Sequence, residues 1–186
     1  MLIAKQKRRE NIAEYILYLW QLEDLLRALL FDGDKIYSTL VEPLQVNDEK
    51  KQEIFFWYIS ITNLLKEEGK ETSGHTSHSL HLIRELNDVH NYLLKLGDEK
   101  YRVLYAKAKP NIDAYREKSG NDRTSDIEVC FNALYAKMLL SLRKETVSAD
   151  TEEAFKTFSS LLAYLAAKFH RFENGEEAYA PDELND

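Results

Sequence analysis

The sequence predicts an all-α protein, folded as a single-domain antiparallel bundle of six to seven helices. Apolar residues recur at spacings of three and four along most of the chain, which is the period of helices that pack on one another. Alternation of period two, typical of half-buried strands, nowhere persists for six residues. Only 6 glycines and 3 prolines are present, which is little turn material for a protein of many strands. A length of 186 residues with 44% apolar content suits one compact domain with a sizeable core.

The first predicted helix, which ends at Asp32-Gly33-Asp34, carries an apolar stripe with one charged member. The stripe consists of Ile12, Ile16, Leu19, Glu23, Leu26 and Leu30. Glu23 occupies a position where leucine is expected, and Arg27 lies one turn further on, within its reach. A charged pair inside an apolar seam indicates either a structural polar lock or a functional site.

The later helices are predicted from their boundary signals. Asp34 can cap a short second helix that Pro43 stops. The remaining helices are expected from Asn47 or Asp48 to Gly69, from Ser73-Gly74 to Gly97, from Asp98 to the loop 119–122, from Ser125 onward, and from Asp150 to Asn174-Gly175. Pro110 should kink or break the helix that contains it, because proline removes one hydrogen bond and clashes with the preceding turn. The short connections favour antiparallel neighbours.

Two regions are expected: a helical domain over 1–174 and an acidic, disordered tail over 175–186. The tail contains five acids and no base, and Tyr179 and Leu184 are its only substantial apolar anchors.

The chain resembles an uncharacterised family of helical proteins, about this length, from gut-dwelling anaerobic bacteria. The runs Arg8-Arg9-Glu10-Asn11-Ile12-Ala13 and Trp20-Gln21-Leu22-Glu23-Asp24-Leu25-Leu26-Arg27 carry the resemblance. The family is a domain of unknown function, so the resemblance implies a full-length helical domain in a bacterial cytoplasm and no particular activity or site residue.

Glu23, Arg27 and Asp24 form the main candidate for a polar core or a ligand pocket. Buried ion pairs are tolerated when further hydrogen bonds complete both partners, and Tyr15 and Tyr58 lie on or beside inward stripes from which they could supply them. A structural network is the main interpretation. A small-molecule pocket anchored on Glu23 and Arg27 is the alternative, because pockets in bundles combine apolar walls with a few polar groups.

Histidines supply a weaker hypothesis of a metal site. His75, His78 and His81 are three residues apart, and Glu85 follows one turn after His81, so one helix could present a His-x-x-His step and a carboxylate to zinc or iron. No second histidine pair exists elsewhere in the sequence, although metal sites in bundles usually draw ligands from several helices.

Composition excludes several classes of protein and predicts no cofactor. A net charge of −7 argues against general affinity for nucleic acid. No apolar run is long enough to span a bilayer, and the single cysteine, Cys130, fits a reducing compartment, so we expect a cytoplasmic protein that binds neither membrane nor nucleic acid. Glycine-rich phosphate loops, zinc-spaced cysteine pairs and Gly-x-Ser-x-Gly elbows are all missing from the sequence.

The sequence therefore favours a non-enzymatic helical interaction module whose partner is a protein, with a second copy of the chain as one candidate. Phe55, Phe56 and Ile59 lie away from the main stripe of their helix, and an apolar second face needs a second neighbour. The alternative is a small-molecule-binding or metal-dependent enzyme centred on Glu23, Arg27 and the His75–His81 turn.

Overall fold

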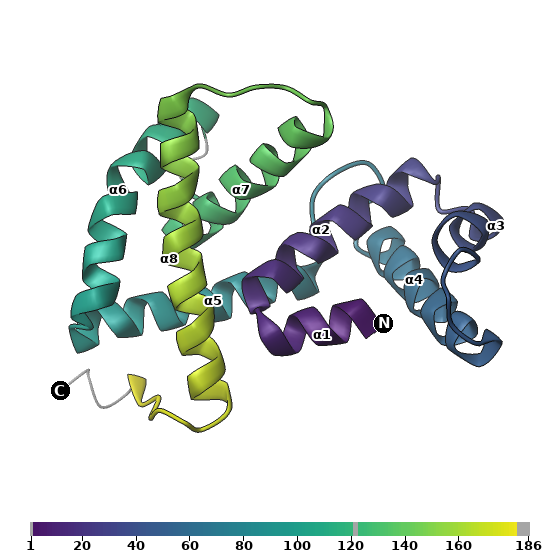
Figure 1. Cartoon of the computed structure of the whole chain (residues 1–186), viewed down its shortest axis with the longest axis horizontal. Helices are drawn as coiled ribbons and strands as arrows, with labels where there is room; N and C mark the ends of the chain where they lie inside the picture. The colour runs from purple at the N-terminus through teal and green to yellow at the C-terminus, as the bar shows by residue number, and fades with distance from the viewer. Residues whose placement is uncertain (1, 121–122, 182–186) are drawn as a thin grey trace. The chain divides into compact units, whose positions relative to one another are not determined.

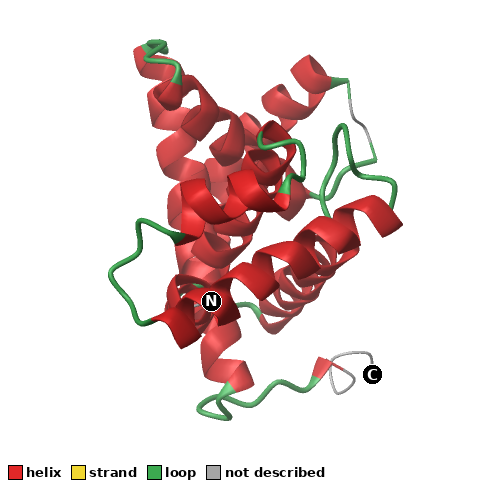
Figure 2. Ribbon diagram, turned by 90° about the vertical axis from the view of Figure 1, so that its right-hand side faces the viewer, coloured by secondary structure: helices red, strands yellow, loops and turns green. Residues whose placement is uncertain are grey.

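The computed structural model describes residues 2–120 and 123–181, and within these ranges it contains helices and connecting loops but no strand (Figure 2). The predicted all-α class is confirmed. The helices follow one another along the chain as shown in Figure 1. They are α1 (Leu2–Glu10), α2 (Ile12–Ala28), α3 (Gly33–Ile36), the π-helix η1 (Tyr37–Val41), α4 (Asp48–Glu67), α5 (Ser77–Leu96), α6 (Glu99–Ser119), α7 (Asp126–Leu142) and α8 (Ala149–Glu173). The predicted number of six to seven helices is not confirmed, since the described ranges hold eight α-helices.

The described residues divide into two compact units. The first comprises 2–10 and 14–81, and the second comprises 11–13 together with the described residues from 82 to 181. Within the described ranges, no helix combines the length and the apolar composition that crossing a bilayer requires.

The first unit has a core between α2, the α3–η1 segment and α4. Its buried members are Leu22, Leu26, Ile36, Val41, Ile54, Tyr58 and Leu65. Aromatic side chains on α2 and α4 extend this packing, because the rings of Tyr18 and Trp57 stack at 6.5 Å between centroids. Of the stripe predicted for α2, Leu26 lies in this core, together with three members of the stripe predicted for α4: Ile54, Tyr58 and Leu65.

The end of α2 differs from the prediction. α2 stops at Ala28, and Leu30, the last member of the predicted inward stripe, is 73% exposed. Leu30 and Phe31 have φ values of 58° and 56°, in the left-handed region, and the Phe31 N–H donates to the Leu26 carbonyl at 3.1 Å. This turn closes the helix and directs Leu30 outward, so the helical period no longer applies to it. The following short helix is capped by Asp32, which accepts from the Asp34 and Lys35 amides, rather than by Asp34 as predicted.

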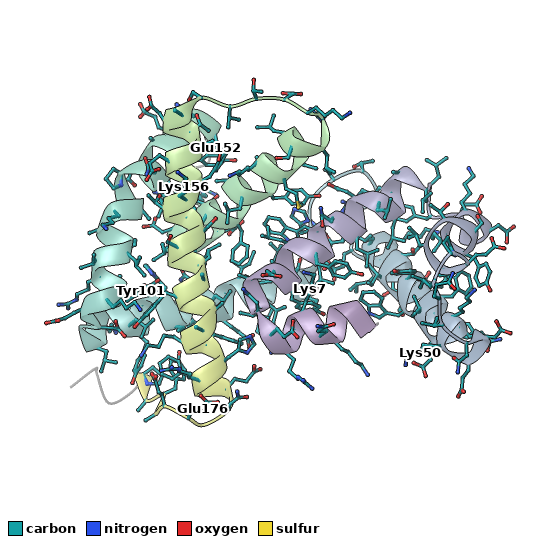
Figure 3. The ribbon with its side chains drawn as sticks, viewed as in Figure 1. Lys7, Lys50, Tyr101, Glu152, Lys156 and Glu176 are labelled. Atoms are coloured by element: carbon teal, nitrogen blue, oxygen red, sulfur yellow. The ribbon has the colours of Figure 1, made fainter. Side chains whose placement is uncertain are left out.

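The second unit is built mainly from α5 to α8, in which α6, α7 and α8 pack against one another. α6 and α8 run in opposite directions (Figure 1). The interior is aromatic: Tyr101, Phe131 and Phe158 are almost fully buried, and Tyr101 stacks on Tyr164 at 6.0 Å. Figure 3 labels Tyr101 among the side chains of this unit. Cys130 is also fully buried.

Pro110 does not interrupt α6, which continues to Ser119, so of the predicted kink or break the break is wrong and the kink stays a prediction. Both Pro110 and Ala106, the residue whose carbonyl loses its helical donor, are exposed, and water can replace the missing hydrogen bond. Ser125 caps α7 as predicted, by accepting from the Glu128 N–H at 3.2 Å. α8 begins earlier than expected, because its cap is Ser148 and not Asp150.

Two residues of the predicted tail, Glu177 and Tyr179, contact α5 or α8 within the second unit. Glu177 pairs with Lys168 and Arg171, both at 2.7 Å, and the ring of Tyr179 packs on Tyr92 and Phe172 at 4.9 and 5.3 Å. The remaining tail residues, 182–186, lie outside the described residues. The division into a helical domain and a disordered tail stays a prediction.

His90 makes the stability of the second unit sensitive to pH. Its ring is buried, with Nδ1 2.6 Å from the Tyr101 hydroxyl, and burial lowers the pKa of His90 more than nearby Asp126 raises it. The unfolded chain therefore takes up this proton more readily, so the stabilising contribution is complete above about pH 6.5 and declines as the pH falls below it.

We expect the wild type to lose more unfolding free energy than His90→Gln between about pH 7.5 and about pH 5, a window above the titration of ordinary carboxyl groups. Urea unfolding of both proteins at the two pH values measures the difference, with the other four histidines common to both. Equal losses in the two proteins would contradict the prediction.

Candidate functional site

Glu23 is buried as predicted, with 1% of its surface exposed, in the first unit. Its carboxylate accepts from two groups of Thr76, the backbone N–H at 3.2 Å and the hydroxyl at 2.7 Å. The second carboxylate oxygen lies 2.8 Å from Nδ1 of His75. Three polar contacts thus satisfy a carboxylate that would otherwise be expensive to bury.

The imidazole of His75 is held between this carboxylate and an indole ring. Trp20, one helical turn before Glu23, stacks on His75 with 3.8 Å between centroids and 5° between planes. The Trp20 Nε1–H donates to the Ser79 hydroxyl at 3.2 Å, and Ser79 donates to the Thr76 carbonyl at 3.0 Å. These contacts make one continuous network, which we call the Glu23 network: Trp20, Glu23, His75, Thr76 and Ser79.

Arg27 does not pair with Glu23, so the predicted Glu23–Arg27 lock is wrong. Its Nη1 lies 2.6 Å from the Asp24 carboxylate, and its Nε donates to the Lys70 carbonyl at 2.9 Å. Nη2 donates to the Gly74 carbonyl. The four-residue spacing brings the two side chains to neighbouring places on α2, but each reaches a different part of the connection between α4 and α5.

Glu23 and Arg27 therefore share a structural role, because both form hydrogen bonds from α2 to the connection 68–76. Glu68 completes this arrangement from the end of α4, since its carboxylate accepts from the backbone N–H and the hydroxyl of Ser77, the first residue of α5. The Glu23 carboxylate already accepts from Thr76 and contacts His75, so its main role is to hold this connection in place. Of the two interpretations left open by the sequence, this geometry favours the structural network.

The two candidate tyrosines lie outside the Glu23 network. Tyr58 belongs to the apolar core of the first unit, where burial raises its pKa and its hydroxyl is hydrogen-bonded to Tyr18. Tyr15 contacts the edge of His78, with 6.5 Å between ring centroids, and burial raises its pKa too.

The predicted metal-site helix is not formed as expected. α5 begins at Ser77, so His75 lies in the preceding loop and cannot share a helical face with His78 and His81. Within residues 2–120 and 123–181, no group of three histidine, cysteine, aspartate or glutamate side chains is arranged to hold a metal ion. The identity of His75, His78, His81 and Glu85 as ligands stays a prediction without geometric support.

A small pocket of about 200 Å³ lies beside the Glu23 network. Apolar and aromatic side chains form most of its wall, together with Glu23 and three other polar residues. The lining residues are Tyr15, Leu19, Glu23, Trp57, Ser60, Ile61, Leu64, Thr76 and His78. This composition is typical of ligand pockets, although the volume is below the usual range of about 300–1,000 Å³.

The first unit also exposes aromatic side chains near α3, η1 and α4. Phe56 is 66% exposed and Tyr37 38%. Phe55 lies between them, with ring centroids 5.5 Å from Tyr37 and 6.1 Å from Phe56. We call Tyr37, Phe55 and Phe56 the aromatic patch. Phe55 and Ile59, which the sequence assigned to a second apolar face, are partly buried against the core of this unit, so the exposed part of that face is smaller than expected.

The sequence identified Glu23 but not three other members of the Glu23 network, Trp20, Thr76 and Ser79. The helical period identifies inward positions, and it carries no information on which loop folds over them. Thr76 directly precedes α5, and the Leu80 N–H donates to its carbonyl. A threonine directly before a helix is a typical cap, and Thr76 itself was the signal available in the sequence.

Comparison with known protein families identifies a match over most of the chain. The model of the family described as "Domain of unknown function (DUF4924)" matches residues 1–176. Neither a curated protein nor a solved structure matches the chain. Because the family model spans nearly the whole chain, the protein belongs to the DUF4924 family.

Proposed function

We propose that this protein is a non-enzymatic helical interaction module that associates with a second copy of itself through the aromatic patch. The observation that carries the proposal is the exposure of Phe56 beside two further aromatic rings, since exposed aromatic clusters mark association surfaces more often than single apolar residues do.

The surroundings of Phe56 on α4 suit a pairing of two antiparallel copies of this helix. One turn before Phe56 lies Glu53, which pairs with Lys50 at 2.5 Å, and one turn after it lies Ser60. In an antiparallel pair centred on Phe56, Glu53 of one copy lies opposite Ile59 of the other, and Ser60 lies opposite Gln52, so like charges do not meet across the centre. Such a self-complementary contact has the two-fold symmetry of most homodimers.

The test is the molar mass in solution from low to high micromolar concentration, by size-exclusion chromatography with light scattering. We expect a monomer–dimer equilibrium for the wild type, and Phe56→Glu should weaken association by about 30-fold or more, because a buried aromatic anchor carries about 2 kcal/mol. Val103→Glu on α6 is the matched control, since Val103 is an exposed apolar residue of the second unit, at 55%.

A monomer at every concentration would remove the proposal, and so would a dimer that Phe56→Glu leaves intact. Phe56 is exposed, so circular dichroism should show that the variant keeps its fold and that any loss concerns association alone.

The small pocket beside the Glu23 network supports a second candidate, a protein that binds a small molecule. A fragment screen by ligand-observed NMR tests it, with Ile61→Trp as the variant that fills the pocket. Fragments that bind the wild type and the filled variant equally would exclude this pocket as their site.

The other elements of the proposal follow from composition. A single buried cysteine supports a reducing, cytoplasmic location, and the acidic net charge of −7 supports partners other than nucleic acid. We also propose that the helices of each unit are arranged as an antiparallel bundle, a form supported by the opposite directions of α6 and α8.

A further inference from the structure

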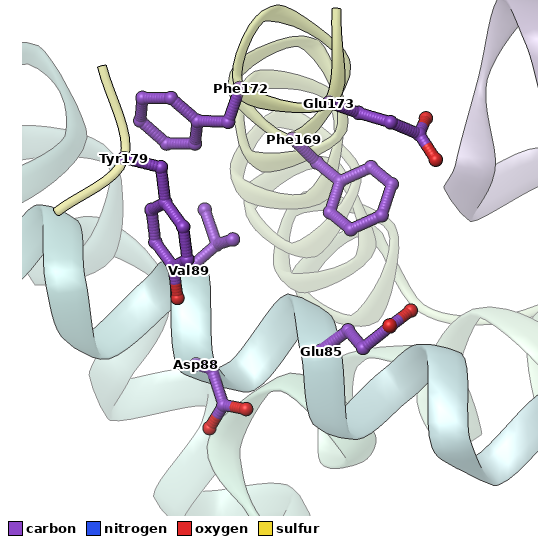
Figure 4. A pocket seen from close by; sticks show the side chains of 7 residues that line it. All are labelled: Glu85, Asp88, Val89, Phe169, Phe172, Glu173 and Tyr179. Carbon is purple, nitrogen blue, oxygen red and sulfur yellow. The ribbon is translucent and has the colours of Figure 1, made fainter. Parts of the chain in front are cut away.

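The second unit contains a cavity of about 410 Å³ that the sequence did not indicate. It lies between α5, α8 and the segment that follows α8 (Figure 4). Its lining consists of Glu85, Asp88, Val89, Phe169, Phe172, Glu173 and Tyr179. The volume lies within the usual range for small-ligand sites.

Three aromatic rings form much of this wall. Phe169 and Phe172 project from α8, and Tyr179 reaches in from the C-terminal segment (Figure 4). Tyr92, behind the wall, fixes two of these rings: its own ring contacts Phe172 at 5.6 Å and Tyr179 at 4.9 Å, in both cases edge-on. Two of the three rings are therefore held in place by a third aromatic side chain, and the faces of such rings carry negative potential.

The charged groups of the lining have one sign. Of the described residues that line the cavity, three are carboxylic acids and none is basic. Lys168 and Arg171, the nearby cations of α8, are directed to Glu177, each at 2.7 Å. The cavity thus combines acidic side chains from α5 and α8 with electron-rich rings.

Glu173 is additionally oriented by a histidine. The Ile12 N–H donates to Nε2 of His170 at 3.2 Å, so the neutral ring carries its proton on Nδ1. Nδ1 lies 3.4 Å from the Glu173 carboxylate. This contact favours a position of the carboxylate beside His170, at the border of the cavity.

We infer that this cavity binds a small organic ammonium ion, with Phe172 and Tyr179 around its alkyl or methyl groups and Glu85 and Glu173 balancing its charge. Aromatic faces attract desolvated ammonium groups, and carboxylates at the border select cations over neutral compounds of the same shape. A bare metal ion is not expected, because the described acids have no metal-binding arrangement and the aromatic wall offers no ligand atoms. This inference is independent of self-association through the aromatic patch.

The test compares choline with 3,3-dimethylbutan-1-ol, a neutral molecule of nearly the same shape, by isothermal titration calorimetry and protein NMR. Choline should bind at least about tenfold more tightly, because only its charge distinguishes the two compounds. Butylammonium, a primary amine, is titrated in parallel to cover ammonium ions that carry no methyl groups.

Tyr179→Leu should weaken binding of the ammonium ion by about three- to thirtyfold, since leucine keeps an apolar wall and removes the π-face. Glu85→Gln should weaken binding more at low ionic strength than at high ionic strength, because the substitution removes a charge and keeps the shape of the side chain. Tyr37→Leu is the matched control, because Tyr37 is a tyrosine of similar exposure, at 38% against 40%, that lies in the first unit.

Selective binding of either ammonium compound, lost in Tyr179→Leu and kept in Tyr37→Leu, supports the inference. Binding of the neutral compound as tight as that of choline overturns it. Failure of both ammonium compounds to bind at millimolar concentration, or unchanged affinity in Tyr179→Leu, overturns it too. A melting temperature for Tyr179→Leu close to that of the wild type shows that lost binding is not lost folding.

Discussion

Replacing Glu23 by leucine should lower the free energy of unfolding by about 3–5 kcal/mol. The variant leaves the hydroxyl and N–H of Thr76 and the ring of His75 without the carboxylate, in a site where the Glu23 side chain itself is only 1% exposed. Stranded polar groups of this kind are among the few causes of losses this large. Denaturant unfolding monitored by circular dichroism measures the effect.

A double-mutant cycle identifies the partner. Glu23→Leu and His75→Phe should couple by about 1–3 kcal/mol, because each variant alone removes the contact between the carboxylate and the imidazole. Glu23→Leu and Arg27→Leu should couple less, since the two side chains bond to different groups of the connection between α4 and α5. A larger coupling with Arg27 than with His75 would contradict the network described above.

Asp98→Ala should have the largest effect in the second unit, about 2–4 kcal/mol. Asp98 caps α6 by accepting from the Tyr101 N–H at 2.9 Å, and the same carboxylate accepts from the Tyr164 hydroxyl at 3.0 Å and lies 3.3 Å from the Lys168 ammonium. One side chain therefore starts α6 and attaches it to α8. Ser148→Ala, which removes only the exposed cap of α8, is the control and should cost about 1 kcal/mol.

The pH dependence of this loss provides a second check. Burial raises the pKa of Asp98, but the bonds from Tyr101, Tyr164 and Lys168 lower it more, so the net shift is downward. The stabilising contribution is then complete above the ordinary pKa of about 4 and is lost as the pH falls through the lower value in the folded protein. The difference in stability between wild type and Asp98→Ala should shrink below about pH 4, as measured by urea unfolding. A difference that stays constant down to about pH 2 would show that the charge of Asp98 contributes nothing.

The helical period predicted most of the elements because each long helix has one face toward a core. Glu23 was found in this way: it interrupts a leucine-like stripe, and the structure buries it. Leu30 was assigned to the same stripe, but a turn with positive φ ends α2 before it. The two residues with positive φ, Leu30 and Phe31, are not glycines, so the sequence did not signal the turn.

The partners of Glu23 lie in a chain segment that has no helical repeat of apolar residues, so the sequence did not identify them. His75 is 52 residues from Glu23 and lies in a loop, where its place is decided by stacking on Trp20 and by the bonds of Thr76. The cavity of the second unit has the same origin, since Tyr179 comes from a segment of acidic composition that suggested disorder. Contacts made by loops and termini are tertiary, and single-sequence patterns do not contain them.

The tethering of the α4–α5 connection has a consequence for how sequences of this family can vary. Residues 71–74 are exposed and form no regular helix, which in most proteins marks a place where insertions are tolerated. Here, however, Arg27 holds the carbonyl groups of Lys70 and Gly74, and Glu23 holds Thr76, so an added residue would shift one set of partners against the other. Relatives that keep a carboxylate at position 23 and an arginine at position 27 should therefore keep the length of this loop, and changes of length should accumulate instead in the exposed connection between α7 and α8.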